Sequence, residues 1–291
     1  MKNHDGVQRH ATSVRTLFKC YCLGEINIYV ERSRDVARAK LLMKAGMGAT
    51  FGVWITIPHP EVVEILSNLP FDWFMFDMEH APITVEKLET MLMPLRGSDI
   101  VPLARVPWND PVEIKRVLDL GVAGVLVPWV NTREEAERAV KAVRYPPWGI
   151  RGVGPRRSVM YGFADVVKYY KEWDENYVLL VQVETAEAVE NVEEIASVEG
   201  VTGLFVGPND LSASLGAFRD FKNPKFTAAL ERVLAAAKSR GKLAGVMTYS
   251  PEEAARMVEM GFNFVALSHD VKYLVEGAKA FLRVKELLGR R

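Results

Sequence analysis

Short apolar runs that alternate with amphipathic helical patterns are the feature of this sequence that most constrains its fold. Most of the runs are continuously apolar, which is typical of strands covered on both faces, as in a parallel sheet. The sequence predicts eight such strands, at residues 50–57, 72–78, 101–106, 122–130, 177–184, 203–207, 243–248 and 264–268.

A helical pattern separates each predicted strand from the next. The predicted helices cover residues 60–69, 85–95, 111–120, 133–143, 188–198, 224–240, 251–260 and 273–288. Asp110 and Ser250 each stand before a proline, as an N-cap residue does, and Gly121 and Gly261 follow helix ends, where a left-handed residue is favoured. Eight strand–helix units in 291 residues predict an α/β protein with a (β/α)8 TIM barrel. A doubly wound open sheet is the main alternative.

Composition excludes several classes of function. The 291 residues have a formal net charge of zero and no long Lys/Arg run. The chain therefore has no field to attract nucleic acid or an anionic membrane, and we expect a small-molecule substrate. Cys20 and Cys22 have no other cysteine to pair with, which excludes a disulfide framework. Because no apolar run approaches the ~20 residues that span a bilayer, we expect a cytoplasmic protein.

Residues 1–42 differ from the rest of the chain because they are polar, lean towards basic residues and lack a clean period. We expect residues 43–291 to form the barrel domain and residues 1–42 an N-terminal extension. The extension is either a helix that caps the barrel floor or contacts another subunit, or a disordered leader, which we favour. The connection at residues 144–176 is oversized and contains aromatic residues and prolines, so we expect an ordered segment packed on the barrel or on a neighbouring subunit.

Polar residues gather where the predicted strands end, and in a barrel these ends form one rim that carries the reactive groups. Glu184 ends the fifth predicted strand and Asp210 follows the sixth. Two oxygen ligands that leave coordination positions open suit Mg²⁺ or Mn²⁺ and also accept Co²⁺. The pattern therefore predicts a divalent metal site at Glu184 and Asp210. The alternative is that each carboxylate caps a helix or pairs with an arginine.

His80 and Arg105 also stand at predicted strand ends. His80 comes directly after acidic residues and is a candidate general base, because imidazole titrates near neutral pH, although a lone histidine can also be structural. Arg105 would present its guanidinium to anionic oxygen. The alternative for Arg105 is a salt bridge to Asp77 or Glu79.

The turn at residues 207–211 presents backbone N–H groups where a helix begins, which is a natural seat for a carboxylate. Pro208 and Asn209 in this turn, and Gln182 on the neighbouring strand end, are therefore candidate substrate-binding residues together with Arg105. No predicted strand ends in a lysine, and Lys272 is the only near candidate. A Schiff-base mechanism is therefore disfavoured, and a metal is the expected electron sink.

At these positions the sequence resembles the HpcH/HpaI aldolase family, the class II pyruvate aldolases that include 4-hydroxy-2-oxoheptanedioate and 2-keto-3-deoxy-sugar-acid aldolases. The similarity runs from about Gly52 to the last helix. It rests on the motifs Phe71-Asp72, Asp77-Met78-Glu79-His80, Arg105-Val106-Pro107, Leu118-Asp119-Leu120-Gly121, Arg144-Tyr145-Pro146-Pro147, Arg151-Gly152, Gln182-Val183-Glu184-Thr185 and Gly207-Pro208-Asn209-Asp210-Leu211-Ser212.

The resemblance implies a metal-dependent class II aldolase that reversibly cleaves 4-hydroxy-2-oxo acids or 2-keto-3-deoxy sugar acids to pyruvate and an aldehyde. It implies that Glu184 and Asp210 hold the divalent ion. It also implies that His80 is the base, that Arg105 binds the carbonyl oxygen, and that Asp119 partners His80. In addition, it implies a last helix exchanged between protomers of a homohexamer built as a trimer of dimers. Two other functions stay open: a CoA-thioester lyase of the citrate-lyase-beta type, and a non-catalytic ligand-binding barrel.

Overall fold

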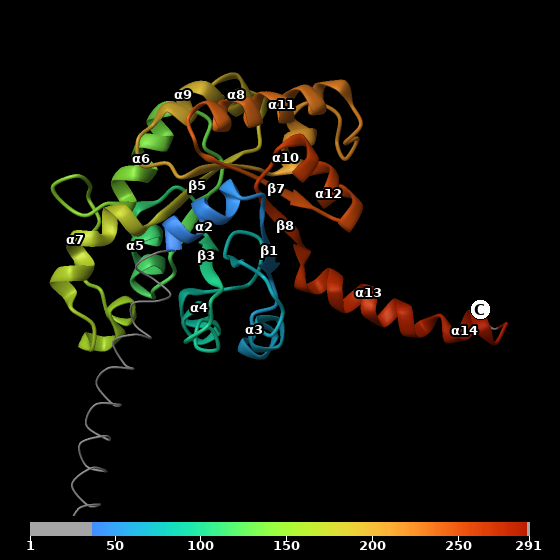
Figure 1. Cartoon of the computed structure of the whole chain (residues 1–291), viewed down its shortest axis with the longest axis horizontal. Helices are drawn as coiled ribbons and strands as arrows, with labels where there is room; N and C mark the ends of the chain where they lie inside the picture. Colours follow the sequence, from blue (N-terminus) through green and yellow to red (C-terminus); the bar gives the residue numbers. More distant parts are fainter. Residues whose placement is uncertain (1–36, 290–291) are drawn as a thin grey trace, which may run out of the picture.

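Eight parallel strands close into a barrel in the computed structural model, which describes residues 37–289 (Figure 1). Each strand pairs with the next one along the chain, and the last pairs with the first. The strands are β1 (Thr50–Ile55), β2 (Trp73–Asp77), β3 (Val101–Arg105), β4 (Gly124–Val127), β5 (Val178–Val183), β6 (Gly203–Val206), β7 (Leu243–Thr248) and β8 (Phe264–His269). The predicted TIM barrel is confirmed, and the open-sheet alternative is wrong because closure leaves no strand edge unpaired.

Helices surround the barrel and connect its strands (Figure 1). They are α2 (Ala37–Gly46), α3 (Pro60–Ser67), α4 (Val85–Met91), α5 (Pro111–Asp119), α6 (Arg133–Val143), α7 (Val166–Asn176), α8 (Ala186–Glu190), α9 (Val192–Ser197), α10 (Pro208–Ser214), α11 (Pro224–Ser239), α12 (Pro251–Met260), α13 (Asp270–Leu282) and α14 (Val284–Leu287), with a 3-10 helix η1 (Arg157–Gly162). The predicted helix at 188–198 is divided between α8 and α9, and the closing helix between α13 and α14. No helix in the described part of the chain has the length and apolar character to cross a membrane.

Helix ends lie where the capping residues predict them. Asp110 accepts hydrogen bonds from two backbone N–H groups at the start of α5, and Ser250 accepts one at the start of α12. These side chains satisfy N–H groups that have no partner within the helix. Gly261 ends α12 with a φ of +114°, which a side chain would disfavour.

Apolar packing inside the barrel fixes which strand residues face its mouth. Trp73 stacks on Phe264 with ring centroids 4.0 Å apart, and Phe205 meets Phe264 edge-on. Strand residues alternate between the interior and the helix-covered exterior. On β2 the interior residues Trp73 and Met75 are therefore followed by Asp77, at the carboxyl end of the strand. Asp77 thus continues the row of inward-facing residues on β2, and its side chain forms part of the rim at the mouth of the barrel.

Helix α2 closes the opposite end of the barrel. Ala37, Leu41 and Ala45 are buried in one cluster with the interior strand residues. Residues 37–42 therefore pack on the barrel floor, within a helix that crosses the boundary expected after residue 42. The remainder of the predicted extension, residues 1–36, lies outside the described residues.

The oversized connection is ordered and packs on the barrel, as expected. It contains η1 and α7, which the helical pattern did not predict. The side chain of Arg151 is fully buried, and its guanidinium lies 4.5 Å from the ring of Tyr145 and 4.4 Å from that of Trp173. Arg151 also donates to Asp119 at 2.7 Å. These contacts hold the loop around Arg151 against α5 and α7, because a buried guanidinium is costly without such partners.

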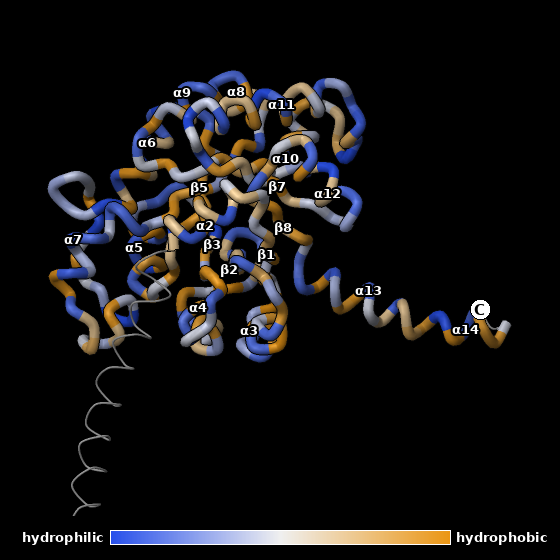
Figure 2. The backbone as a smooth tube through the Cα atoms, viewed as in Figure 1, coloured by the Kyte–Doolittle hydropathy of each residue, from blue (hydrophilic) through white to orange (hydrophobic). Residues whose placement is uncertain are grey.

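Helix α13 projects away from the barrel instead of completing the ring of helices (Figure 1). Asp270 is its one buried residue, and α14 has none. Figure 2 shows hydrophobic positions along the projecting helices, and Phe281 and Leu287 expose 86% and 84% of their surface. An apolar surface of this extent indicates an interaction site.

Gly52→Ala should destabilise the barrel, because a Cβ at residue 52 would lie 2.1 Å from Cδ2 of Trp73. Trp73 is held in its stack with Phe264 and cannot move aside cheaply. We expect the free energy of unfolding to fall by about 2–3 kcal/mol in denaturant titrations. Gly46→Ala is the matched control, since nothing lies within 4 Å of its Cβ position, and should change stability by less than about 0.5 kcal/mol. Equal effects in the two variants would contradict this packing account.

Candidate active site at the barrel rim

Asp77 and Arg105 form a buried ion pair at the carboxyl ends of β2 and β3. The strand register sets them side by side. Arg105 donates through Nε to Asp77 Oδ1 at 2.9 Å and through Nη2 to Oδ2 at 2.7 Å. Its guanidinium lies 5.4 Å from the ring of Trp54 on β1. The salt bridge expected as an alternative for Arg105 is therefore present, and its two-point geometry fixes the guanidinium plane.

Glu79 and His80 follow β2 and lie beside this pair. Glu79 Oε2 is 3.0 Å from Arg105 Nη1, and the side chain of Glu79 is largely buried. His80 exposes 66% of its side chain, and its Nε2 lies 3.8 Å from Glu79 Oε1. The backbone N–H groups of Glu79 and His80 both donate to Asp77 Oδ1. His80 is thus an accessible imidazole with a carboxylate neighbour, the arrangement that a general base requires.

Glu184 is held through both oxygens of its carboxylate. It follows β5 and is 1% exposed. Its Oε1 accepts a hydrogen bond from the backbone N–H of Trp129 at 2.7 Å, and its Oε2 accepts one from Nε2 of Gln182. Gly207 at the end of β6 comes so near that a Cβ there would lie 2.8 Å from Glu184 Oε2. The carboxylate therefore lies in a cradle that glycine alone leaves open.

Asp210 lies in the first turn of α10, directly after the strand that pairs with β5. Its charge raises the pKa of Glu184, so the two carboxylates interact. Pro208 and Asn209 open the same helix, and Nδ2 of Asn209 donates to the hydroxyl of Tyr249 at 2.9 Å. The structure thus brings the two predicted metal ligands to neighbouring strand ends.

Two buried acids of the rim ionise less readily than free carboxyl groups. Burial raises the pKa of Glu184 to about 7, against the lowering effect of the Trp129 amide, and the charges of Glu79 and Asp210 raise it further. Burial also raises the pKa of Glu79, although Arg105 opposes this shift. Burial and the neighbouring carboxylates thus outweigh the attraction of Arg105, and an added cation would stabilise the ionised form of these acids.

A divalent ion fits this set of donors. Within residues 37–289, no group of three or more His, Cys, Asp or Glu side chains is placed to hold a metal. A bound ion would take the carboxylates of Glu184 and Asp210, which interact at neighbouring strand ends, and fill its other positions with water or substrate oxygens. Nearby, Oε1 of Gln182 and Oδ1 of Asn209 are buried without a hydrogen-bond partner in the described part of the chain. Such polar atoms are typical of a site whose ligands complete it.

Asp119 is not brought to His80 within the chain. It ends α5, and because barrel helices run opposite to the strands, it lies at the amino-terminal end of the barrel. Its carboxylate accepts from Arg151 at 2.7 Å. In the described residues, the side chain of His80 has its ionic contact with Glu79 instead. The role predicted for Asp119 stays a prediction for the assembled protein.

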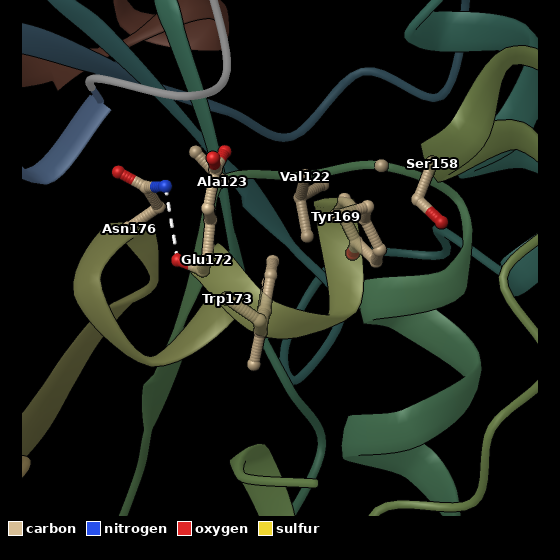
Figure 3. Close-up of a pocket in the computed structure, with 8 residues that line it drawn as sticks. Val122, Ala123, Ser158, Tyr169, Glu172, Trp173 and Asn176 are labelled. Carbon is tan, nitrogen blue, oxygen red and sulfur yellow. Dashed lines mark hydrogen bonds between the residues drawn. The ribbon is translucent and has the colours of Figure 1, made fainter. Parts of the chain in front are cut away.

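A small cavity lies beside the residues that precede β4, at the amino-terminal end of that strand (Figure 3). Figure 3 shows it between Val122 and Ala123, before β4, and Trp173 and Asn176 of α7. Its volume of 20 Å³ has room for about one water molecule. It is therefore too small to hold a substrate.

Sequence reasoning missed two supports of this site. Trp129 supports Glu184 through a backbone amide, which every residue except proline carries, so the residue type gives no signal. Trp54 lies beneath Arg105, and it could have been found from its inward position on β1.

Comparison with known proteins agrees with the geometry. The family described as HpcH/HpaI aldolase/citrate lyase matches residues 50–277. The chain is also 42% identical, over 221 residues, to the 5-keto-4-deoxy-D-glucarate aldolase of Citrobacter koseri. That alignment covers 76% of this chain and 85% of the relative.

Solved structures show the same similarity. An HpcH/HpaI aldolase/citrate lyase family protein from Burkholderia cenocepacia superposes with a TM-score of 0.80 at 32% identity, covering 86% of this chain and 98% of that one. The HpcH/HpaI aldolase from Desulfitobacterium hafniense gives 0.78 at 28% identity, covering 83% and 94%. The prediction of a carbon–carbon lyase is thereby confirmed. The chain belongs to the HpcH/HpaI aldolase/citrate lyase family.

Proposed function

We propose that the protein is a metal-dependent aldolase that reversibly cleaves a 2-keto-3-deoxy sugar acid, or a related 4-hydroxy-2-oxo acid, to pyruvate and an aldehyde. The observation that carries the proposal is the convergence of Glu184, Asp210 and Arg105 on one end of the barrel. The similarity to a 5-keto-4-deoxy-D-glucarate aldolase favours a hydroxylated sugar acid as the substrate class.

Glu184 and Asp210 would hold the divalent ion. Mg²⁺, Mn²⁺ and Co²⁺ suit two carboxylate oxygens with positions left open. When bound, the ion supplies electrophilic stabilisation for negative charge that develops on the C2 oxygen of a 2-oxo acid. Gln182 holds one oxygen of Glu184 so that the carboxylate does not turn away.

Arg105 would donate to the same C2 oxygen. A guanidinium has five N–H donors, and Asp77 and Glu79 engage three of its nitrogens without using every donor. Because the ion pair fixes the guanidinium plane, the remaining donors are oriented before the substrate arrives. Donors that need no reorganisation stabilise developing charge most effectively.

His80 would move the proton of the C4 hydroxyl, directly or through one water. Loss of this proton lets the C4–O bond become the carbonyl of the aldehyde, while the electrons of the C3–C4 bond move towards C2. The reverse reaction returns the proton to the aldehyde oxygen. We also propose that Asp119 orients His80 from a neighbouring copy, since one chain places these residues at opposite ends of the barrel.

We propose further that α13 packs against another copy of the chain in a homo-oligomer, as expected of an exchanged last helix in a trimer of dimers. The helix leaves the barrel (Figure 1), and within residues 37–289 Asp270 is the one buried residue of α13. Burial of its exposed apolar side chains in a second copy would remove them from water.

Pyruvate should exchange its methyl protons for deuterium in the presence of the protein and Mg²⁺, as followed by NMR. This exchange requires formation of the pyruvate enolate but no aldehyde, so it can be measured before the aldehyde substrate is identified. Glu184→Ala and Asp210→Ala should each slow exchange by at least ~100-fold. Glu187→Ala, on the exposed surface of α8, is the matched control and should not. Exchange that persists in EDTA would refute the metal, and no exchange by the wild type would point to a CoA-thioester lyase or a ligand-binding barrel.

Glu184→Gln should stabilise the metal-free protein at pH 8 but not at pH 5. The pKa of Glu184 is raised from 4.5 to about 7 in the folded state. The folded protein therefore binds an extra proton between these values, and stability is lost as the pH rises through that window. Glutamine does not ionise, so the variant should melt about 5 °C above wild type at pH 8. A difference in Tm that is the same at both pH values would contradict the raised pKa.

Replacement of both Phe281 and Leu287 by glutamate should dissociate the oligomer, because buried carboxylates would oppose packing of this surface. The molar mass from light scattering should fall to that of a smaller species. Lys279→Glu is the control, since it breaks only an exposed pair with Glu276, and it should leave the mass unchanged. A wild-type protein that is already monomeric would show that α13 serves another purpose.

A further inference from the structure

Trp129 adopts a backbone conformation that residues with side chains rarely take. It comes after β4 and has a φ of +53°, in the left-handed region. A Cβ is crowded in this region, so the surroundings of Trp129 must impose the conformation. Strained residues of this kind concentrate at functional sites, and this one lies at the reactive end of the barrel.

The conformation determines where the backbone N–H of Trp129 points. The N–H donates to Oε1 of Glu184 at 2.7 Å, across the ends of two adjacent strands. Gln182 donates to the other oxygen, so each oxygen of Glu184 keeps lone pairs free for a cation. A backbone donor in a fixed turn cannot rotate away, unlike a donor on a flexible side chain.

The turn that contains Trp129 is tied to the segment that follows Glu184. Oδ1 of Asn131 accepts a hydrogen bond from the hydroxyl of Thr185. The backbone carbonyl of Asn131 accepts one from Nδ2 of Asn191 at 2.9 Å. These bonds join the loop after β4 to both ends of α8, the helix that follows β5. The amide donor and the carboxylate acceptor are therefore held in one rigid unit.

We propose that Trp129 is a positioning residue for Glu184, and that it acts through its backbone N–H and left-handed turn, not through its indole. This inference rests on the proposed function, because it concerns how one ligand is held for a divalent ion. Without the N–H, Glu184 keeps its charge but gains freedom to rotate, and the ion loses a preoriented ligand.

Three substitutions separate the N–H from the side chain. Trp129→Gly keeps the N–H and reaches the observed φ without a clash, and Trp129→Ala keeps the N–H with the strain. Trp129→Pro removes the N–H and fixes φ near about −65°. The Kd of Mn²⁺ is measured by EPR titration of the full chain. Glu184→Gln, titrated in parallel, establishes that the ion counted is the one at this site.

We expect Kd values within about 3-fold of wild type for Trp129→Gly and Trp129→Ala, and binding at least ~10-fold weaker for Trp129→Pro. If the proline variant does not fold, the α-hydroxy analogue of tryptophan at residue 129 removes only the N–H, and the same weakening is expected. Wild-type affinity in that ester variant would overturn the inference, as would equal weakening by glycine. Failure of the proposed function is distinct, because wild type and Glu184→Gln would then bind Mn²⁺ alike.

Discussion

Arg105 is the cation around which the acids of the barrel rim are arranged. It bonds Asp77 at two points, lies 3.0 Å from Glu79, and lowers the pKa of Glu184 through its charge. One guanidinium cannot neutralise three carboxylates and Asp210 as well, and burial raises the pKa of Glu184 to about 7, so ionisation of this group in the folded protein is unfavourable. Retention of such charge costs the metal-free protein stability. The same carboxylates would stabilise a bound divalent ion. The groups that lower the stability of the metal-free protein are therefore the groups that would bind the metal.

Closure of the barrel gives this arrangement its precision. The acids and Arg105 come from the ends of two adjacent strand pairs, β2 with β3 and β5 with β6, which β4 separates in the ring. Asp77 and Arg105 each follow buried inward-facing residues of their own strand, and on β2 the first of these, Trp73, is held in its stack with Phe264. The rim is therefore built on rigid strands, while the helix ends and the turn at Trp129 orient the remaining groups.

Much of the fold could be predicted, because continuous apolar runs and capping residues are local signals. The run at 243–248 coincides with β7, whereas the run at 122–130 extends beyond β4 (Gly124–Val127). The excess has a physical cause, since Trp129 turns into the left-handed region and ends the strand although its neighbours stay buried. Helix α7 was not predicted, although Val166, Tyr169, Tyr170 and Trp173 recur at helical spacing, because its tyrosines are only partly buried and also fit a packed loop.

Some residues of the candidate site could also be predicted from the sequence, and others could not. Glu184 and Asp210 could be predicted, since strand ends of a barrel share one rim. The amide of Trp129 and the cradle at Gly207 could not, because they depend on backbone conformation and close approach. The resemblance in sequence implied that Asp119 partners His80. Within one chain, however, the carboxylate of Asp119 accepts a hydrogen bond from Arg151.

The central claim is that the carboxylates of Glu184 and Asp210 coordinate the same divalent ion. Anomalous diffraction from crystals soaked in Mn²⁺ tests it most directly. The account predicts one strong peak bonded to a carboxylate oxygen of each residue at about 2.0–2.3 Å. A fully occupied peak elsewhere, with neither carboxylate within bonding distance, would contradict it.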